Sequence, residues 1–145
     1  MEVKQQIKKY IAGIPDPRGT EIQDLHQHIV RAFPKWKLWF FDGKNTEDKT
    51  VTNQTIGYGV HTIKYANGTT REVFRIGMGA NKTGIFVYIL PIRNKTYLAE
   101  TYGKKLGKAT MTGYCIKFKT LRDVNIEVLL DAMNYKAEPE NQTKS

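Results

Sequence analysis

A strand–turn–strand pattern in the middle of the chain constrains the fold most: GYGVHTIKY, then ANGT, then TREVFRIGM. An Asn-Gly pair between two runs of β-branched and aromatic residues is a strong hairpin signal, because a type I′ turn needs positive φ at both central residues. We therefore predict an antiparallel hairpin over residues 57–78, with Ala66 paired to Thr69. The run IFVYILPI, residues 85–92, follows the turn GANKTG and predicts a third strand of a meander.

The predicted register sorts the hairpin side chains onto two faces, because residues directly opposite each other in an antiparallel pair point to the same side. The face expected to pack on the core carries His61, Ile63, Phe74, Ile76 and Met78. The outer face is expected to present Tyr58, Lys64, Arg71 and Arg75. This register predicts an outer sheet surface that mixes cations with an aromatic ring.

Helices are predicted at both ends of the chain. Apolar residues recur at helical spacing in three segments: Ile7, Tyr10, Ile11 and Ile14; Ile22, Leu25, Ile29 and Phe33; and Val124, Val128, Leu129 and Ala132. Residues 36–41 predict a short strand or an aromatic plug, residues 95–103 a short helix, and residues 112–119 another strand. Strands in one run with helices at both ends favour an α+β fold, an antiparallel β-sheet with helices packed on one face.

The size of the chain suits one domain. At 145 residues it can bury a core without metals or disulfides, and its single cysteine, Cys115, excludes an internal disulfide framework. We predict one domain over residues 1–136 and a disordered tail over 137–145, because the tail is polar. The N-terminus lacks the apolar run of a signal peptide and no segment is long enough to span a bilayer, so we expect a cytoplasmic protein without membrane contact.

The charge of the chain favours anionic partners. There are 23 Lys and Arg against 14 Asp and Glu, a formal net charge of +9. Between residues 102 and 119 there are five lysines and no acid. Three of them, Lys108, Lys117 and Lys119, extend the predicted outer face. We hypothesise that this basic sheet face binds an anionic ligand or protein partner, with nucleic acid as a further candidate; an ordinary solvated face or a homodimer surface is the alternative.

The segment YGKKLGKAT, residues 102–110, looks like a phosphate-binding loop but lacks its requirements. A P-loop needs four residues between its glycines and a hydroxyl after its lysine, whereas three residues follow Gly103 before Gly107, and Ala109 stands at the hydroxyl position. We therefore interpret Gly103 as a helix-ending residue in the left-handed conformation. The segment therefore does not favour a nucleotide-hydrolysing function.

The tracts KYANGTTREVFRIGMGANKTGIFVYIL and TYLAETYGKKLGKATMTGYCIKFKTL resemble the YdhG-like bacterial domain family of unknown function. The resemblance spans most of the chain, from the first predicted helix to the last. It implies a frataxin-like fold and one functional alternative, an intracellular iron chaperone or metal-delivery protein. It carries over no catalytic residue. Frataxin-type iron binding uses an acidic ridge on the first helix, whereas VKQQIKKYI holds Lys4, Lys8 and Lys9 and no acid.

One candidate metal site lies on the second predicted helix. Glu21, Asp24 and His28 fall within about 60° of arc opposite the apolar stripe, and two carboxylates with an imidazole suit a divalent metal such as Fe²⁺. The alternative is a solvated helix face with a local ion pair. No arrangement of nucleophile, base and acid stands out along the chain. The sequence thus predicts a non-enzymatic binding protein without a cofactor, with iron as the alternative.

Overall fold

The computed structural model describes residues 2–44, 47, 49, 53–92 and 94–135 and confirms the α+β class. The predicted tail, residues 137–145, lies outside the described residues. The helices are α1 (Val3–Ala12), α2 (Arg18–Ala32), α3 (Tyr97–Tyr102), the short 3-10 helix η1 (Leu121–Asp123) and α4 (Ile126–Met133). The strands are β1 (Leu38–Phe41), β2 (Thr55–Tyr58), β3 (His61–Lys64), β4 (Thr70–Val73), β5 (Ile76–Asn81), β6 (Gly84–Ile89), β7 (Thr110–Thr112) and β8 (Cys115–Phe118).

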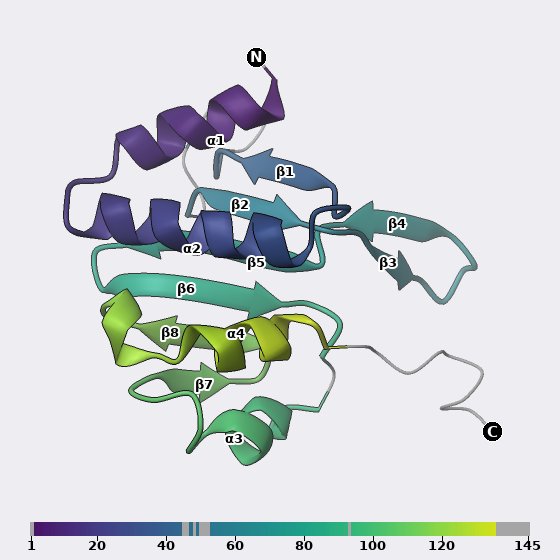
Figure 1. The fold of residues 1–145 in the computed structure, drawn as a ribbon. Coiled ribbons are helices and arrows are strands. Elements are labelled where there is room, and N and C mark those ends of the chain that lie inside the picture. Colours follow the sequence, from purple (N-terminus) through teal and green to yellow (C-terminus); the bar gives the residue numbers. More distant parts are fainter. Residues whose placement is uncertain (1, 45–46, 48, 50–52, 93, 136–145) are drawn as a thin grey trace.

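Six of the strands form one antiparallel sheet, in the order β1-β2-β5-β6-β8-β7. Helices α1, α2 and α4 cover one face of this sheet, and α3 lies beside β7 at its edge (Figure 1). The predicted arrangement of helices on one face is therefore confirmed. None of the helices among the described residues is both long and apolar enough to cross a lipid bilayer.

The core lies between the helices and the covered face. The apolar stripes predicted for the helices supply Ile7 and Ile11 from α1, the three residues 22, 25 and 29 from α2, and residues 129 and 132 from α4, all buried. Met133 of α4, which was not in the predicted stripe, is buried with them. One row of the sheet beneath them runs through Phe40, Ile56, Met78, Val87, Ile116 and Met111. A continuous apolar row under three amphipathic helices is what gives this fold its single core.

The predicted central hairpin is interrupted at residues 59 and 60, between β2 and β3. β2 and β5 belong to the six-stranded sheet, whereas β3 and β4 form a separate two-stranded ribbon that projects beyond it (Figure 1). Gly59, with φ of 76°, lies at the break and accepts a 2.7 Å hydrogen bond from Nε1 of Trp39 through its carbonyl oxygen. His61 and Ile63 were predicted in the core, but both are only half-buried because the ribbon leaves the sheet.

The register of the hairpin also differs from the prediction by one residue. Lys64 pairs with Thr70, and the amide of Tyr65 donates to the carbonyl of Thr69 at 2.9 Å, so the loop holds three residues rather than two. Gly68 has φ of 89°, as a three-residue loop with a left-handed last residue requires. The prediction of a two-residue turn was wrong. The cross-strand partner of each hairpin residue is therefore one residue away from the predicted partner.

The uncovered face of the sheet is lined by glycines and aromatic rings. One row crosses all six strands: Trp39, Gly57, Gly77, Tyr88, Cys115 and Thr112. Phe74, predicted in the core, lies here instead, since a Cβ at Gly57 or Gly77 would come within 2.7 or 2.6 Å of its side chain. The ring therefore fills the space that the two glycines leave open.

Gly103 does not have the predicted left-handed conformation. Its φ of −52° and ψ of −37° are those of a right-handed helix, and the chain continues to turn until Leu106, whose amide donates to the carbonyl of Tyr102. The conformational requirement falls on Gly107 instead, with φ of 117° and an ideal Cβ only 2.2 Å from the carbonyl oxygen of Asp123. A Cβ at Gly103 would also come within 2.4 Å of the carbonyl oxygen of Ala99, but of the two glycines Gly107 is the one with a positive φ.

Candidate functional site

Tyr58 is not on the surface, although the sequence predicted it there. Its side chain is 1% exposed, and its hydroxyl lies 2.7 Å from Nδ1 of His26 on α2. Burial, with the phenol of Tyr10 as a second cause, holds the pKa of Tyr58 well above its ordinary value. Burial also lowers the pKa of His26. The one-residue register difference is the reason: it turns Tyr58 toward the helices.

Lys64 and Arg71, also predicted for the anion-binding face, lie on the projecting ribbon. Both are exposed, but Lys64 pairs with Thr70 and Arg71 pairs with Ile63, so the two cations point to opposite sides of the ribbon. They therefore do not form one surface with each other. The predicted set of seven residues is divided among several places in the structure.

Three of the predicted residues do come together. Lys108, Lys117 and Lys119 line one cavity of about 610 Å³, which we call the lysine cavity. All three side chains are exposed, and Lys117 lies on the uncovered face between Phe86 of β6 and Thr110 of β7. Among the described residues that line the cavity, Asp123 supplies the one carboxylate. The local charge is strongly positive.

Local backbone geometry builds this cavity. Gly84 begins β6 where an ideal Cβ would lie 2.4 Å from the carbonyl oxygen of Phe118, so β6 and β8 approach closely there. The amide of Lys108 donates to the carbonyl oxygen of Asp123 at 2.9 Å. This bond, next to the bridge between Gly107 and Val124, holds the start of β7 against the segment before α4. The lysines on the two arms of the β7–β8 hairpin are thereby held at one end of the sheet, beside the segment that precedes α4.

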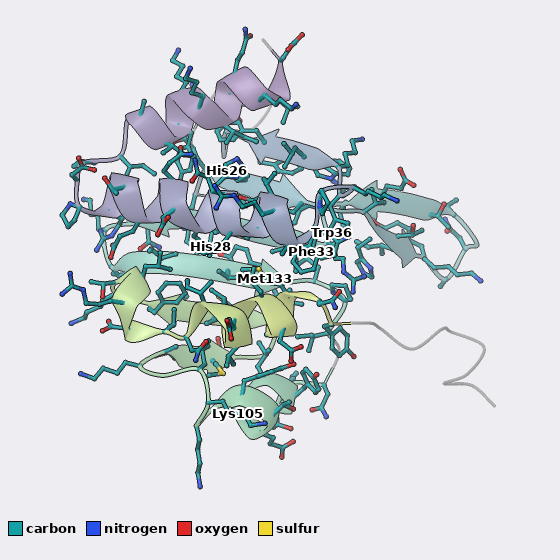
Figure 2. All side chains as sticks on the ribbon, in the orientation of Figure 1. His26, His28, Phe33, Trp36, Lys105 and Met133 are labelled. Atoms are coloured by element: carbon teal, nitrogen blue, oxygen red, sulfur yellow. The ribbon has the colours of Figure 1, made fainter. Side chains whose placement is uncertain are left out.

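Arg75, the last of the predicted residues, lies elsewhere. It precedes β5, and its guanidinium carbon is 5.6 Å from the centroid of the Trp36 ring. Trp36 in turn stacks on Phe33 with 3.9 Å between ring centroids, and Figure 2 shows this pair beyond the C-terminal end of α2. A second cavity, of about 450 Å³, is lined by Arg75, Trp36, Lys35 and Lys37. We call it the arginine cavity.

The predicted metal ligands share one side of α2 but do not form a metal centre. In the described part of the chain, no three His, Cys, Asp or Glu side chains are grouped so that they could hold a metal ion. The carboxylate of Glu21 accepts a 2.9 Å hydrogen bond from the amide of Leu121, which attaches α2 to η1. Figure 2 places His28 on the side of α2 that faces α4, away from His26. Glu21 therefore has a structural role that its spacing on the helix did not reveal.

Sequence reasoning missed the aromatic and basic residues just after α2. Lys35 and Lys37 flank Trp36, and the ammonium group of Lys37 lies 4.3 Å from the centroid of the Trp39 ring. The alternation of lysine and tryptophan in PKWKLW was a visible signal. It was interpreted only as a strand or an aromatic plug, because nothing in the sequence placed Arg75 beside it.

No family model, no curated protein and no solved structure matches this chain. The resemblance to the YdhG-like family and to the frataxin fold therefore stays a prediction.

Proposed function

We propose that the protein is a non-enzymatic binding protein that holds an anionic ligand in the lysine cavity. The observation that carries the proposal is that Lys108, Lys117 and Lys119 line one cavity with a single carboxylate. Cavities of a few hundred cubic ångströms suit small ligands, and ammonium groups attract phosphate and carboxylate as point charges. An iron-delivery function gains no support from the grouping of acidic side chains and histidines in the described chain.

The chemistry of the cavity favours weak, salt-dependent binding. The three lysines are exposed, and exposed ion pairs are worth about 0.2–1 kcal/mol each, so no single contact dominates. The hydroxyl of Thr110 and the side chain of Asn81 also line the cavity and add hydrogen-bonding groups. A flexible anion with several charges, such as pyrophosphate or a short single-stranded oligonucleotide, uses all three lysines at once.

Titration at two salt concentrations tests the proposal. We expect pyrophosphate and a single-stranded oligonucleotide to bind at about 20 mM salt and to bind much more weakly at about 200 mM. Three neutralised phosphates predict a slope of about −2 for log affinity against log salt with a single strand. Replacing Lys108→Gln together with Lys117→Gln leaves one lysine and predicts a slope of about −0.7.

The matched control removes two other charges from the same region. Lys104→Gln with Lys105→Gln changes the net charge by the same amount, and both residues are exposed outside the lysine cavity; Figure 2 places Lys105 beside α3. We expect this control to bind nearly as well as the unaltered protein. Equal losses in the two double variants, or no binding at low salt, would show that the lysine cavity is not a binding site.

A further inference from the structure

The arginine cavity carries an inference that is independent of the lysine cavity. Arg75 extends from the residue before β5 into the space between the loop after α2 and the end of α4. Its backbone is fixed on both sides, since its amide donates to the carbonyl of Tyr58 at 3.0 Å and its carbonyl accepts from Leu90 at 3.0 Å. The side chain therefore leaves the sheet from a rigid position.

The guanidinium of Arg75 is half-buried without an acceptor. Nε is buried, and no atom of the described residues accepts a hydrogen bond from it. Burial lowers the pKa of Arg75, with a smaller opposing contribution from Tyr135. Arg18 also has a buried Nε without a partner, but its NH1 group donates to the carbonyl of Asn81 at 3.0 Å. Buried donors normally have partners, so Arg75 stands out as a charge that lacks one.

The surroundings of Arg75 add positive charge. Lys35 and Lys37, both exposed, line the same cavity, and none of its described lining residues carries a carboxylate. Asn134, which follows α4, also lines it, so the negative end of that helix lies nearby. A helix end contributes about half a charge, which offsets only a small part of three cations.

The Arg75 side chain lies beside Gly59 and the Trp36 ring. Gly59 leaves room beside the side chain, because an ideal Cβ there would lie 3.1 Å from Cβ of Arg75 and 3.2 Å from the Trp36 ring. The Trp36 ring, held by its stack on Phe33, supports the guanidinium from one side. A guanidinium positioned in this way presents its planar set of donors, which pairs with two oxygens of a carboxylate or phosphate.

We propose that the arginine cavity is a binding site for a small oxyanion with two or more negative charges, held by a fork of hydrogen bonds from Arg75 and by the charges of Lys35 and Lys37. Phosphate esters and polycarboxylates share this chemistry. The ligand supplies acceptors to the half-buried guanidinium, so Arg75 is the centre of the site and the two exposed lysines lie around it.

Calorimetry and NMR of the full chain test the proposal with pyrophosphate and citrate as probes. We expect at least one probe to bind and to shift the Nε–H resonance of Arg75. Arg75→Gln should weaken binding at least about tenfold, and Arg75→Lys should give a smaller loss because it keeps the charge without the fork. Arg71→Gln, an exposed arginine on the ribbon, is the matched control and should change affinity less than about twofold.

A second variant covers the case in which Arg75→Gln does not fold. Lys35→Gln with Lys37→Gln alters two exposed side chains and should still weaken binding several-fold, whereas Lys104→Gln with Lys105→Gln should not. Pyrophosphate binding without citrate binding assigns the site to phosphate esters, and the reverse assigns it to polycarboxylates. Absence of binding by both probes up to about 10 mM, or equal losses in Arg71→Gln and Arg75→Gln, overturns the proposal.

Discussion

The buried hydroxyl of Tyr58 predicts a measurable loss of stability on its removal. Tyr58→Phe deletes one oxygen and keeps the ring in the core, but it leaves Nδ1 of His26 without the partner 2.7 Å away. A buried group that loses its hydrogen bond costs about 1–3 kcal/mol. Because His26 is only partly buried, we expect the free energy of unfolding to fall by about 1–2 kcal/mol.

Urea unfolding at pH 8, where His26 is neutral, measures this loss. We expect a lower midpoint with an unchanged slope, since the surface exposed on unfolding stays the same. A double-mutant cycle with His26→Leu should give a coupling energy of at least about 0.5 kcal/mol. If Tyr58 were on the surface, as the two-residue turn required, Tyr58→Phe would change stability by less than about 0.5 kcal/mol. That result, or an additive cycle, would refute the register described above.

The same packing makes two further predictions. Burial lowers the pKa of His26 in the folded state below the ordinary 6.5, so the unfolded chain binds more protons below that pH. The contribution of His26 to stability is therefore full above pH 6.5 and is lost as the pH falls from there through the lowered pKa of the folded state. Urea unfolding between pH 8 and pH 5 should show this loss, and the loss should be smaller in His26→Leu. Gly77→Ala places a Cβ 2.6 Å from the Phe74 ring and should cost about 1–3 kcal/mol. An alanine Cβ at Gly13 would lie no closer than 3.5 Å to any atom, and the φ there is an ordinary −83°, so Gly13→Ala should stabilise the protein by up to about 1 kcal/mol. Calorimetric melting measures the stability of both variants. A change of the same sign in Gly77→Ala and Gly13→Ala would contradict the packing described above.

The elements that follow from local patterns were predicted well. The apolar stripes of α1, α2 and α4 fix both the existence of each helix and its buried face, as Ile22, Leu25 and Ile29 show. β6 was predicted because its whole length is apolar. These features depend on residues that are near each other in the sequence, so they can be predicted from a single sequence.

The register of the hairpin could also have been predicted from the sequence, but from its apolar residues and not from the Asn-Gly pair. Ile56, Tyr58, Ile76 and Met78 all have even numbers, and residues opposite each other in an antiparallel pair share a face. Pairing even residues with even residues buries all four, which is the observed register of Ile56 with Met78. The Asn-Gly pair cannot decide between two and three loop residues, because both need a glycine with positive φ.

The complete lining of each cavity could not be predicted from local sequence patterns. The contact of Gly107 with Val124 places Asp123 beside the lysines of the β7–β8 hairpin, and Arg75 lies next to Trp36 at the break marked by Gly59. Each of these contacts depends on where two separate segments meet after folding. Sequence reasoning correctly selected basic residues as candidates for anion binding. It was wrong to place all of them on one continuous sheet face.

The two cavities lie at opposite ends of one strand, β5. This distance allows an experiment to test one cavity without disturbing the other. Arg75 precedes β5, and Asn81, its last residue, lines the lysine cavity. Six residues of extended chain span about 20 Å, about two and a half times the Debye length at physiological salt. Charge removed from one cavity therefore has little direct effect at the other, and a small anion cannot contact both. Lys108→Gln with Lys117→Gln should leave the shift of the Arg75 Nε–H resonance with pyrophosphate or citrate unchanged. If that double variant abolished the shift, the positive charge of the whole molecule, rather than either cavity, would be what attracts anions.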